Sequence, residues 1–92
     1  MKTVMRYETS PESMAKAQQC FAEHRKRLDE FHARGVLLMA GPVMGEDGKP
    51  EGALGIFTSR EAAEEFVRGD PFVLNGVAVR WSLRDWREVL AP

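Results

Sequence analysis

Several features that often assign a protein to a class are missing from this sequence of 92 residues. Its only cysteine, Cys20, excludes an intrachain disulfide and any metal cluster built on several cysteines, and it suits a reducing compartment. No apolar run is long enough for a signal peptide or a membrane span. We therefore expect a soluble, cytoplasmic protein that does not bind membranes.

An excess of charge of one sign is also absent, because 13 basic residues accompany 14 acidic ones and the formal net charge is −1. This balance provides no general attraction to nucleic acid or to an anionic membrane. The length predicts a single domain over residues 1–92, and a chain of this size buries only a little over about 60% of the surface that it exposes when unfolded. A partner subunit would add to this thin stability margin.

Hydrophobic periodicity and helix caps predict six main elements. They are a strand at residues 2–8, a helix capped by Thr9 or Ser10 that ends near Arg34, strands at residues 36–40 and 53–58, a helix from the cap at residues 58–61 to Gly69, and a strand at residues 77–83. A single helical turn is expected at residues 71–75. This order predicts the α+β class, as a ferredoxin-like βαββαβ two-layer sandwich with an antiparallel sheet.

The two middle strands carry two further expectations. Residues 41–52, GPVMGEDGKPEG, form a connection longer than most hairpin loops, and such loops are more often lids or binding loops. Both strands are apolar on both faces, with Val36, Leu38 and Ala40 alternating with Leu37 and Met39, and Leu54 and Ile56 alternating with Ala53 and Phe57. Since no third layer remains to cover the second face, we predict a homodimer that packs sheet against sheet.

One polar residue, His24, lies on the apolar stripe of the first helix. Spacings of three and four align it with Met14, Ala17, Phe21, Leu28 and Phe31. The best acidic partner is Asp70, directly after the second helix, because the two helices of this fold lie side by side. A carboxylate on one imidazole nitrogen fixes the tautomer and leaves the other nitrogen free for acid–base chemistry. In the structural alternative, His24 is bonded in the core and Asp70 only caps a short helix.

Other candidate residues have less support. Cys20 and His24 are four apart, as in a nucleophile pair or part of a metal site, but no further ligand has matching spacing, so we predict no metal. Arg6 is either a contact for a small anion or a surface residue. Three aromatic residues line a pocket or belong to the core: Tyr7, Phe72 and Trp81. The third strand lacks the basic and aromatic pattern of RNA-binding sheets, which excludes RNA recognition.

Three segments together resemble the YCII-related (YciI-like) domain family, from about Lys2 to Val89: AEHRKRLDEFHARG, LLMAGPV and GALGIFTSREAAEEFVRGDPFVLNGV. The AGP and the DPF…G are their most specific parts. The resemblance implies a ferredoxin-like subunit that dimerises into an α+β barrel, with an active site on a histidine and an aspartate, here His24 and Asp70. Family members often have a basic residue and a proline shortly before this histidine, where the present sequence has Phe21-Ala22-Glu23.

We therefore predict a small enzyme, without a metal or an organic cofactor, that moves protons on a small cyclic or aromatic substrate by isomerisation or elimination. In this hypothesis His24 is the general base or acid and Asp70 orients it. The remaining pocket residues are Arg6, Tyr7, Gly41, Pro42, Phe72 and Trp81, with the loop from Gly41 to Gly52 as wall and lid. The alternative is a non-catalytic dimeric module that binds a small molecule in the same pocket or assists another enzyme. Fold alone does not choose between these functions.

Overall fold

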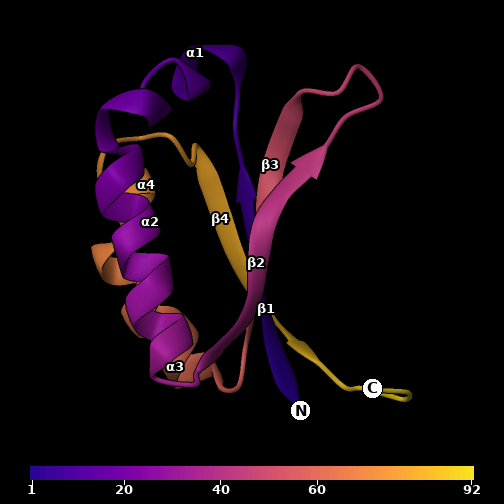
Figure 1. Ribbon diagram of the computed structural model, residues 1–92. Coiled ribbons are helices and arrows are strands. Elements are labelled where there is room, and N and C mark those ends of the chain that lie inside the picture. Colours follow the sequence, from indigo (N-terminus) through magenta and orange to yellow (C-terminus); the bar gives the residue numbers. More distant parts are fainter.

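The computed structural model describes all residues from 1 to 92 and has two layers, a four-stranded antiparallel sheet and a layer of helices on one of its faces (Figure 1). The strands are β1 (Lys2–Glu8), β2 (Leu37–Met44), β3 (Pro50–Phe57) and β4 (Arg80–Trp86). The helices are α1 (Pro11–Met14), α2 (Ala17–Ala33), α3 (Arg60–Gly69) and α4 (Pro71–Leu74). The order within the sheet is β2-β3-β1-β4. The predicted α+β, ferredoxin-like class is confirmed for the chain.

The first predicted helix is divided in two. Ser10 is its N-cap and Pro11 its first residue, and the side chains of Ser10 and Ser13 each accept a hydrogen bond from the other's backbone N–H, at 3.0 and 2.8 Å. The Lys16 N–H then donates to the Ser13 carbonyl, a tight turn that ends α1 before α2 begins. At the far end the chain leaves α2 through Gly35, whose φ of +78° favours glycine, as the sequence predicted.

The prediction of a long loop between the middle strands is wrong. β2 continues through Gly41 and Pro42 to Met44, and β3 begins at Pro50, so only residues 45–49 form the turn. Glycine and proline suggested a loop, but β2 is an edge strand, where a proline costs no ladder hydrogen bond if its nitrogen faces outward. Gly41 and Pro42 therefore belong to the sheet, and the hairpin supplies a rigid wall where a lid was expected.

One face of the sheet packs on the helices and forms the core. Met5 and Tyr7 of β1, Phe57 of β3 and Leu83 of β4 point to this side and are buried. From α3 the predicted stripe fills the space against them, and all of its members are buried: Ala62, Ala63, Phe66 and Val67. The core thus fixes the positions of β1, which carries one residue of the site described below, and of α3, which ends next to that site.

The other face of the sheet is also apolar, and no part of the chain covers it (Figure 1). Val4 pairs with Ile56 on this side, next to Leu54, Met39 and Trp86, around an open hollow of about 730 Å³. In β3 the predicted alternation holds. In β2 it does not, because an irregularity between Leu37 and Met39 shifts the register by one residue. The uncovered apolar face is present as predicted, and the homodimer inferred from it stays a prediction.

The last strand begins later than predicted. β4 starts at Arg80, while Val77 and Ala78 are buried in the connection that follows α4. The Ala78 N–H donates to the Phe72 carbonyl and the Val79 N–H to the Glu8 carbonyl, each at 2.9 Å, so this connection is tied both to α4 and to the end of β1. No helix of the chain is both long enough and apolar enough to cross a membrane.

Candidate functional site

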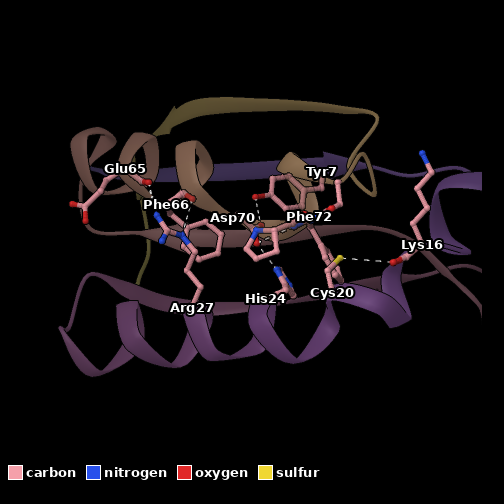
Figure 2. A network of polar contacts seen from close by, with 11 residues as sticks. Tyr7, Lys16, Cys20, His24, Arg27, Glu65, Phe66, Asp70 and Phe72 are labelled. Carbon is pink, nitrogen blue, oxygen red and sulfur yellow. Dashed lines mark hydrogen bonds and ion pairs between the residues drawn. The ribbon is translucent and has the colours of Figure 1, made fainter.

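His24 lies midway along α2 and faces the sheet, with only 9% of its surface exposed. Its Nδ1 is 2.7 Å from the Asp70 Oδ1 atom (Figure 2). Since an ionised carboxylate can only accept hydrogen bonds, the proton between them belongs to Nδ1 of the imidazole. This contact joins two residues that are 46 positions apart in the sequence.

Asp70 occupies the junction between α3 and α4, which directs its side chain toward α2. It is the C-cap of α3 and the N-cap of α4, and Pro71 provides the first residue of α4. Asp70 Oδ1 also accepts a hydrogen bond from the Phe72 N–H at 3.3 Å, a normal capping contact. The predicted capping role is therefore present together with the contact to His24, so the two readings of Asp70 do not exclude each other.

Tyr7 completes the group from the central strand β1. Its hydroxyl donates to Asp70 Oδ2 at 2.5 Å, and both residues are almost completely buried (Figure 2). The buried carboxylate thus accepts three hydrogen bonds, which is what a charge removed from water requires. Lysine and arginine side chains make no ion pair with Asp70, so its charge has His24 as its only partner that can become positive.

Phe72 holds the imidazole from one side. Its ring is stacked on that of His24 with centroids 3.6 Å apart and planes within 3° of parallel. Phe21, one turn earlier on α2, lies 6.4 Å from His24 and 6.5 Å from Phe72 between ring centroids. Stacking and the hydrogen bond to Asp70 together restrict both torsions of the His24 side chain, so the ring is fixed in one orientation.

The second ring nitrogen of His24, Nε2, has no hydrogen-bond partner in the protein, although every fully buried side-chain nitrogen and oxygen has one. Nε2 is therefore not sealed in the core. A cavity of about 50 Å³ adjoins His24, with walls from Tyr7, Leu28 and the β2 residues Gly41 and Pro42. A nitrogen lone pair with a fixed direction, on a histidine that lines a mostly apolar cavity, is suited to exchanging a proton with a bound molecule.

The other predicted pocket residues are distributed over three places. Gly41 and Pro42 line the cavity beside His24, and Phe72 stacks on the imidazole. Arg6 lies on the uncovered face of the sheet, near Val43 and Glu51. Trp81 is half exposed in a groove between α3 and β4. The structure therefore brings Tyr7, Gly41, Pro42 and Phe72 together with the His24–Asp70 pair and leaves Arg6 and Trp81 outside it.

The electrostatic surroundings affect two further residues. Burial, and then the negative charge of Asp70, raise the pKa of the Tyr7 hydroxyl far above its ordinary value, so Tyr7 remains a proton donor at neutral pH. Burial also raises the pKa of the Cys20 thiol, with smaller contributions from Asp70 and Glu23, which keeps the thiol protonated and poorly nucleophilic. No three His, Cys, Asp or Glu side chains lie close enough together to hold a metal ion.

Arg27 keeps the two helices of the site in register. From α2 it donates to the backbone carbonyls of Phe66 and Glu65 on α3, at 3.1 and 2.8 Å (Figure 2). These bonds are made to carbonyls in the second half of α3, shortly before Asp70. Because α2 carries His24 and α3 ends directly before Asp70, these bonds between the two helices help to fix the distance between His24 and Asp70. The charge pattern of the sequence did not suggest this role.

The role of Tyr7 toward Asp70 was missed from the sequence, which suggested an aromatic pocket residue. The available signal was positional. A polar hydroxyl at the end of a buried alternation Thr3, Met5, Tyr7 needs a buried partner, and Asp70 was already expected on the same side of the sheet. The sheet topology brings Tyr7 to Asp70, because β1 is central in the sheet and Tyr7 reaches the α3–α4 junction.

Comparison with solved structures finds the same fold in enzymes. The 5-chloro-2-hydroxyhydroquinone dehydrochlorinase TftG from Burkholderia phenoliruptrix AC1100, solved in complex with 2,5-dihydroxybenzoquinone, is similar with a TM-score of 0.77 and 22% identity, over 95% of this chain and 94% of its own. A mutant of SnoaB, a cofactor-independent oxygenase from Streptomyces nogalater, is similar with a TM-score of 0.56 and 15% identity, over 99% and 96% of the two chains. At these identities the likeness shows the fold.

Sequence comparison is more specific. Protein YciI from Escherichia coli O6:H1 is 35% identical over 74 residues, which cover 72% of this chain and 76% of the relative, and protein YciI from Shigella flexneri matches to the same extent. The model of the YCII-related domain matches residues 1–87, nearly the whole chain. The protein is therefore a member of the YCII-related domain family.

Proposed function

We propose that the protein is a small-molecule enzyme that transfers protons without a metal or an organic cofactor, with His24 as general base and acid and Asp70 as its orienting partner. One observation carries the proposal. His24 Nδ1 is bound to the fully buried Asp70 carboxylate at 2.7 Å, while Nε2 has no partner in the protein and His24 lines a cavity. A histidine with a purely structural role does not need one nitrogen bound to a carboxylate and the other left without a partner.

The chemistry begins with the neutral imidazole. Nε2 takes a proton from a C–H or O–H group of the substrate, and the resulting imidazolium is stabilised by the carboxylate of Asp70 on Nδ1. In an isomerisation, Nε2 returns this proton to another atom of the same conjugated system. In an elimination, the electron pair left on the substrate forms a double bond and expels a leaving group such as chloride, and the proton later passes to solvent.

The shape of the site favours a flat, mostly apolar substrate. The cavity beside His24, about 50 Å³, accepts only part of a ring, and it lies on the helix side of the sheet, whereas the hollow of about 730 Å³ lies on the uncovered face. A cyclic molecule would place one edge in this cavity, at His24. The similarly folded TftG acts on 5-chloro-2-hydroxyhydroquinone, a flat ring that also carries hydroxyl groups.

A homodimer is part of the proposal. The uncovered face presents Val4, Leu54, Ile56, Met39 and Trp86 to solvent, and a second copy packed sheet against sheet would remove this apolar surface from water. It would also cover the hollow on this face. The free thiol of Cys20 suits a reducing compartment, which supports a cytoplasmic location.

The function is tested by separating binding from turnover. Probes are 2,5-dihydroxybenzoquinone for binding, followed by NMR chemical shifts, and chlorinated hydroxyhydroquinones for turnover, followed by chloride release. We expect His24→Gln to retain binding and to lose about 100-fold or more of the turnover rate, since general acid–base catalysis contributes at least this much. His32→Gln is the matched control, because His32 is exposed on the same helix. Binding without turnover in the wild type would favour the non-catalytic module.

A further inference from the structure

We propose that Tyr7 is a positioning residue of this site: its hydroxyl holds one oxygen of Asp70 so that the other oxygen is presented to His24 Nδ1. The inference rests on the proposed function, because it assigns Tyr7 a task in the same proton transfer. It changes the role expected of Tyr7 from contact with the substrate to control of the carboxylate.

The two carboxylate oxygens of Asp70 accept hydrogen bonds from different donors, which supports this role. Oδ2 accepts only from the Tyr7 hydroxyl, at 2.5 Å, while Oδ1 accepts from His24 Nδ1 at 2.7 Å and from the Phe72 N–H at 3.3 Å. The Phe72 bond acts on the oxygen that already faces His24, so it does not fix the rotation of the carboxylate plane. Tyr7 is the contact that does, because it binds the second oxygen from the opposite element, β1.

The chemical nature of the donor matters as well as its position. A lysine or arginine on Oδ2 would cancel the charge of Asp70 before His24 could use it. The neutral Tyr7 hydroxyl solvates the buried carboxylate and leaves its full negative charge available to the imidazolium. Burial and the charge of Asp70 raise the pKa of Tyr7, so the hydroxyl keeps its proton while His24 gains and loses one.

Tyr7 is itself held rigidly. It lies in the central strand β1, paired with Ala53 of β3 and with Trp81 of β4, and it is 2% exposed. Gly52, with φ of +107°, allows β3 to approach closely, since a Cβ at this position would collide with the Tyr7 carbonyl oxygen. A hydroxyl fixed by two strands and already engaged at 2.5 Å is suited to positioning and has little freedom to bind a substrate.

The test uses Tyr7→Phe, which removes the hydroxyl and keeps the ring, with Thr3→Val as control. Thr3 is buried on the same face of the same strand, and valine removes a hydroxyl that makes no contact with Asp70. Nitrogen-15 NMR of the unliganded protein reports the tautomer of His24 and the exchange of its Nδ1 proton with solvent. His32→Gln assigns the signals, because the chain has only two histidines.

In the wild type and in Thr3→Val we expect a single Nδ1–H tautomer with a slowly exchanging proton. In Tyr7→Phe we expect exchange to accelerate about tenfold or more and the second tautomer to appear, as for the loss of a hydrogen bond to a charged group. On the chlorinated hydroxyhydroquinones, kcat should fall about tenfold with KM nearly unchanged, because the hydroxyl acts on His24 and not on the substrate. An unaltered tautomer and exchange rate in Tyr7→Phe would overturn the proposal.

A second measurement covers the case in which Tyr7→Phe does not fold. Tyr7 is the only tyrosine, so 3-fluorotyrosine incorporated in its place labels this residue alone. We expect the fluorine signal to move strongly in Asp70→Asn and to stay unchanged in Thr3→Val, and equal shifts in both variants would overturn the proposal. These NMR measurements need no substrate, so they test the role of Tyr7 even if no turnover is found. If the enzyme is active but the tautomer and proton exchange of His24 are unchanged in Tyr7→Phe, the role of Tyr7 is rejected and the proposed function is not.

Discussion

Alkaline pH should destabilise this protein in part through one buried hydroxyl, that of Tyr7. In the unfolded chain a tyrosine loses its proton near pH 10, whereas burial and the adjacent Asp70 raise the pKa of Tyr7 in the folded state far above this. Below the unfolded pKa both states hold the proton, and the stability from this group is fully present. Above it only the folded state holds the proton, so the free energy of unfolding falls as pH rises.

The magnitude follows from one proton per molecule. The loss is about 1.4 kcal/mol per pH unit, or about 2.7 kcal/mol between pH 10 and pH 12. This is a large share of the roughly 5–14 kcal/mol expected for a domain of this length. The assay is urea unfolding at fixed pH values from 8 to 12, followed by tryptophan fluorescence, for wild type and Tyr7→Phe.

Other groups that titrate in this range are common to both proteins, so the difference between the two unfolding free energies isolates Tyr7. We expect this difference to be constant below pH 10 and then to shrink with the slope of one proton. Tyrosinate absorbance gives an independent reading, because Tyr7 is the only tyrosine, and it should appear only as the protein unfolds. Parallel stability curves for the two proteins up to pH 12 would refute the reasoning.

Three further predictions concern other parts of the chain. Gly52→Ala should lower the free energy of unfolding by about 1–3 kcal/mol, measured with urea, because φ is +107° and the added methyl meets the Tyr7 carbonyl; an unchanged value would contradict the close approach of β3. The hydrogen bond from Lys2 lowers the pKa of Glu88 to about 2, so the carbon-13 carboxyl signal of Glu88 should titrate there, and in Lys2→Met it should titrate higher. The stability contributed by the Glu88 carboxylate is present above the pKa of Glu88 in the unfolded chain and is lost as pH falls through its pKa in the folded protein. Ile56→Glu should convert the proposed dimer to a monomer in sedimentation, and an unaltered mass would exclude the sheet face as the interface.

The fold was predictable because its local signals agree with one another. The cap at Ser10, the glycine at Gly35 and the buried stripe of α3 each lie where the sequence indicated. The errors occurred where tertiary contacts override local propensity. Gly41 and Pro42 suggest a loop in sequence, yet an edge strand tolerates both, because half of its backbone groups need no partner in the sheet.

The site could be predicted only in part for the same physical reason. A histidine on an apolar stripe and an aspartate after the second helix indicated His24 and Asp70, because the order of elements already placed the two helices side by side. The hydrogen bond from Tyr7 and the ties made by Arg27 depend on register and side-chain direction, which no periodicity encodes. The stacking of Phe72 on His24 follows from the single turn of α4, whose direction is set by the cap at Asp70.

The most direct test of the proposed acid–base role is proton exchange at carbon in deuterated water, followed by proton NMR. The probes are 2,5-dihydroxybenzoquinone and a panel of small cyclic diketones, each incubated with wild type, His24→Gln or the control His32→Gln. We predict that wild type and the control catalyse deuterium incorporation into at least one probe, and that His24→Gln is about 100-fold slower while it still binds. Equal rates for wild type and His24→Gln, or no exchange above the uncatalysed rate with any probe, would contradict the account.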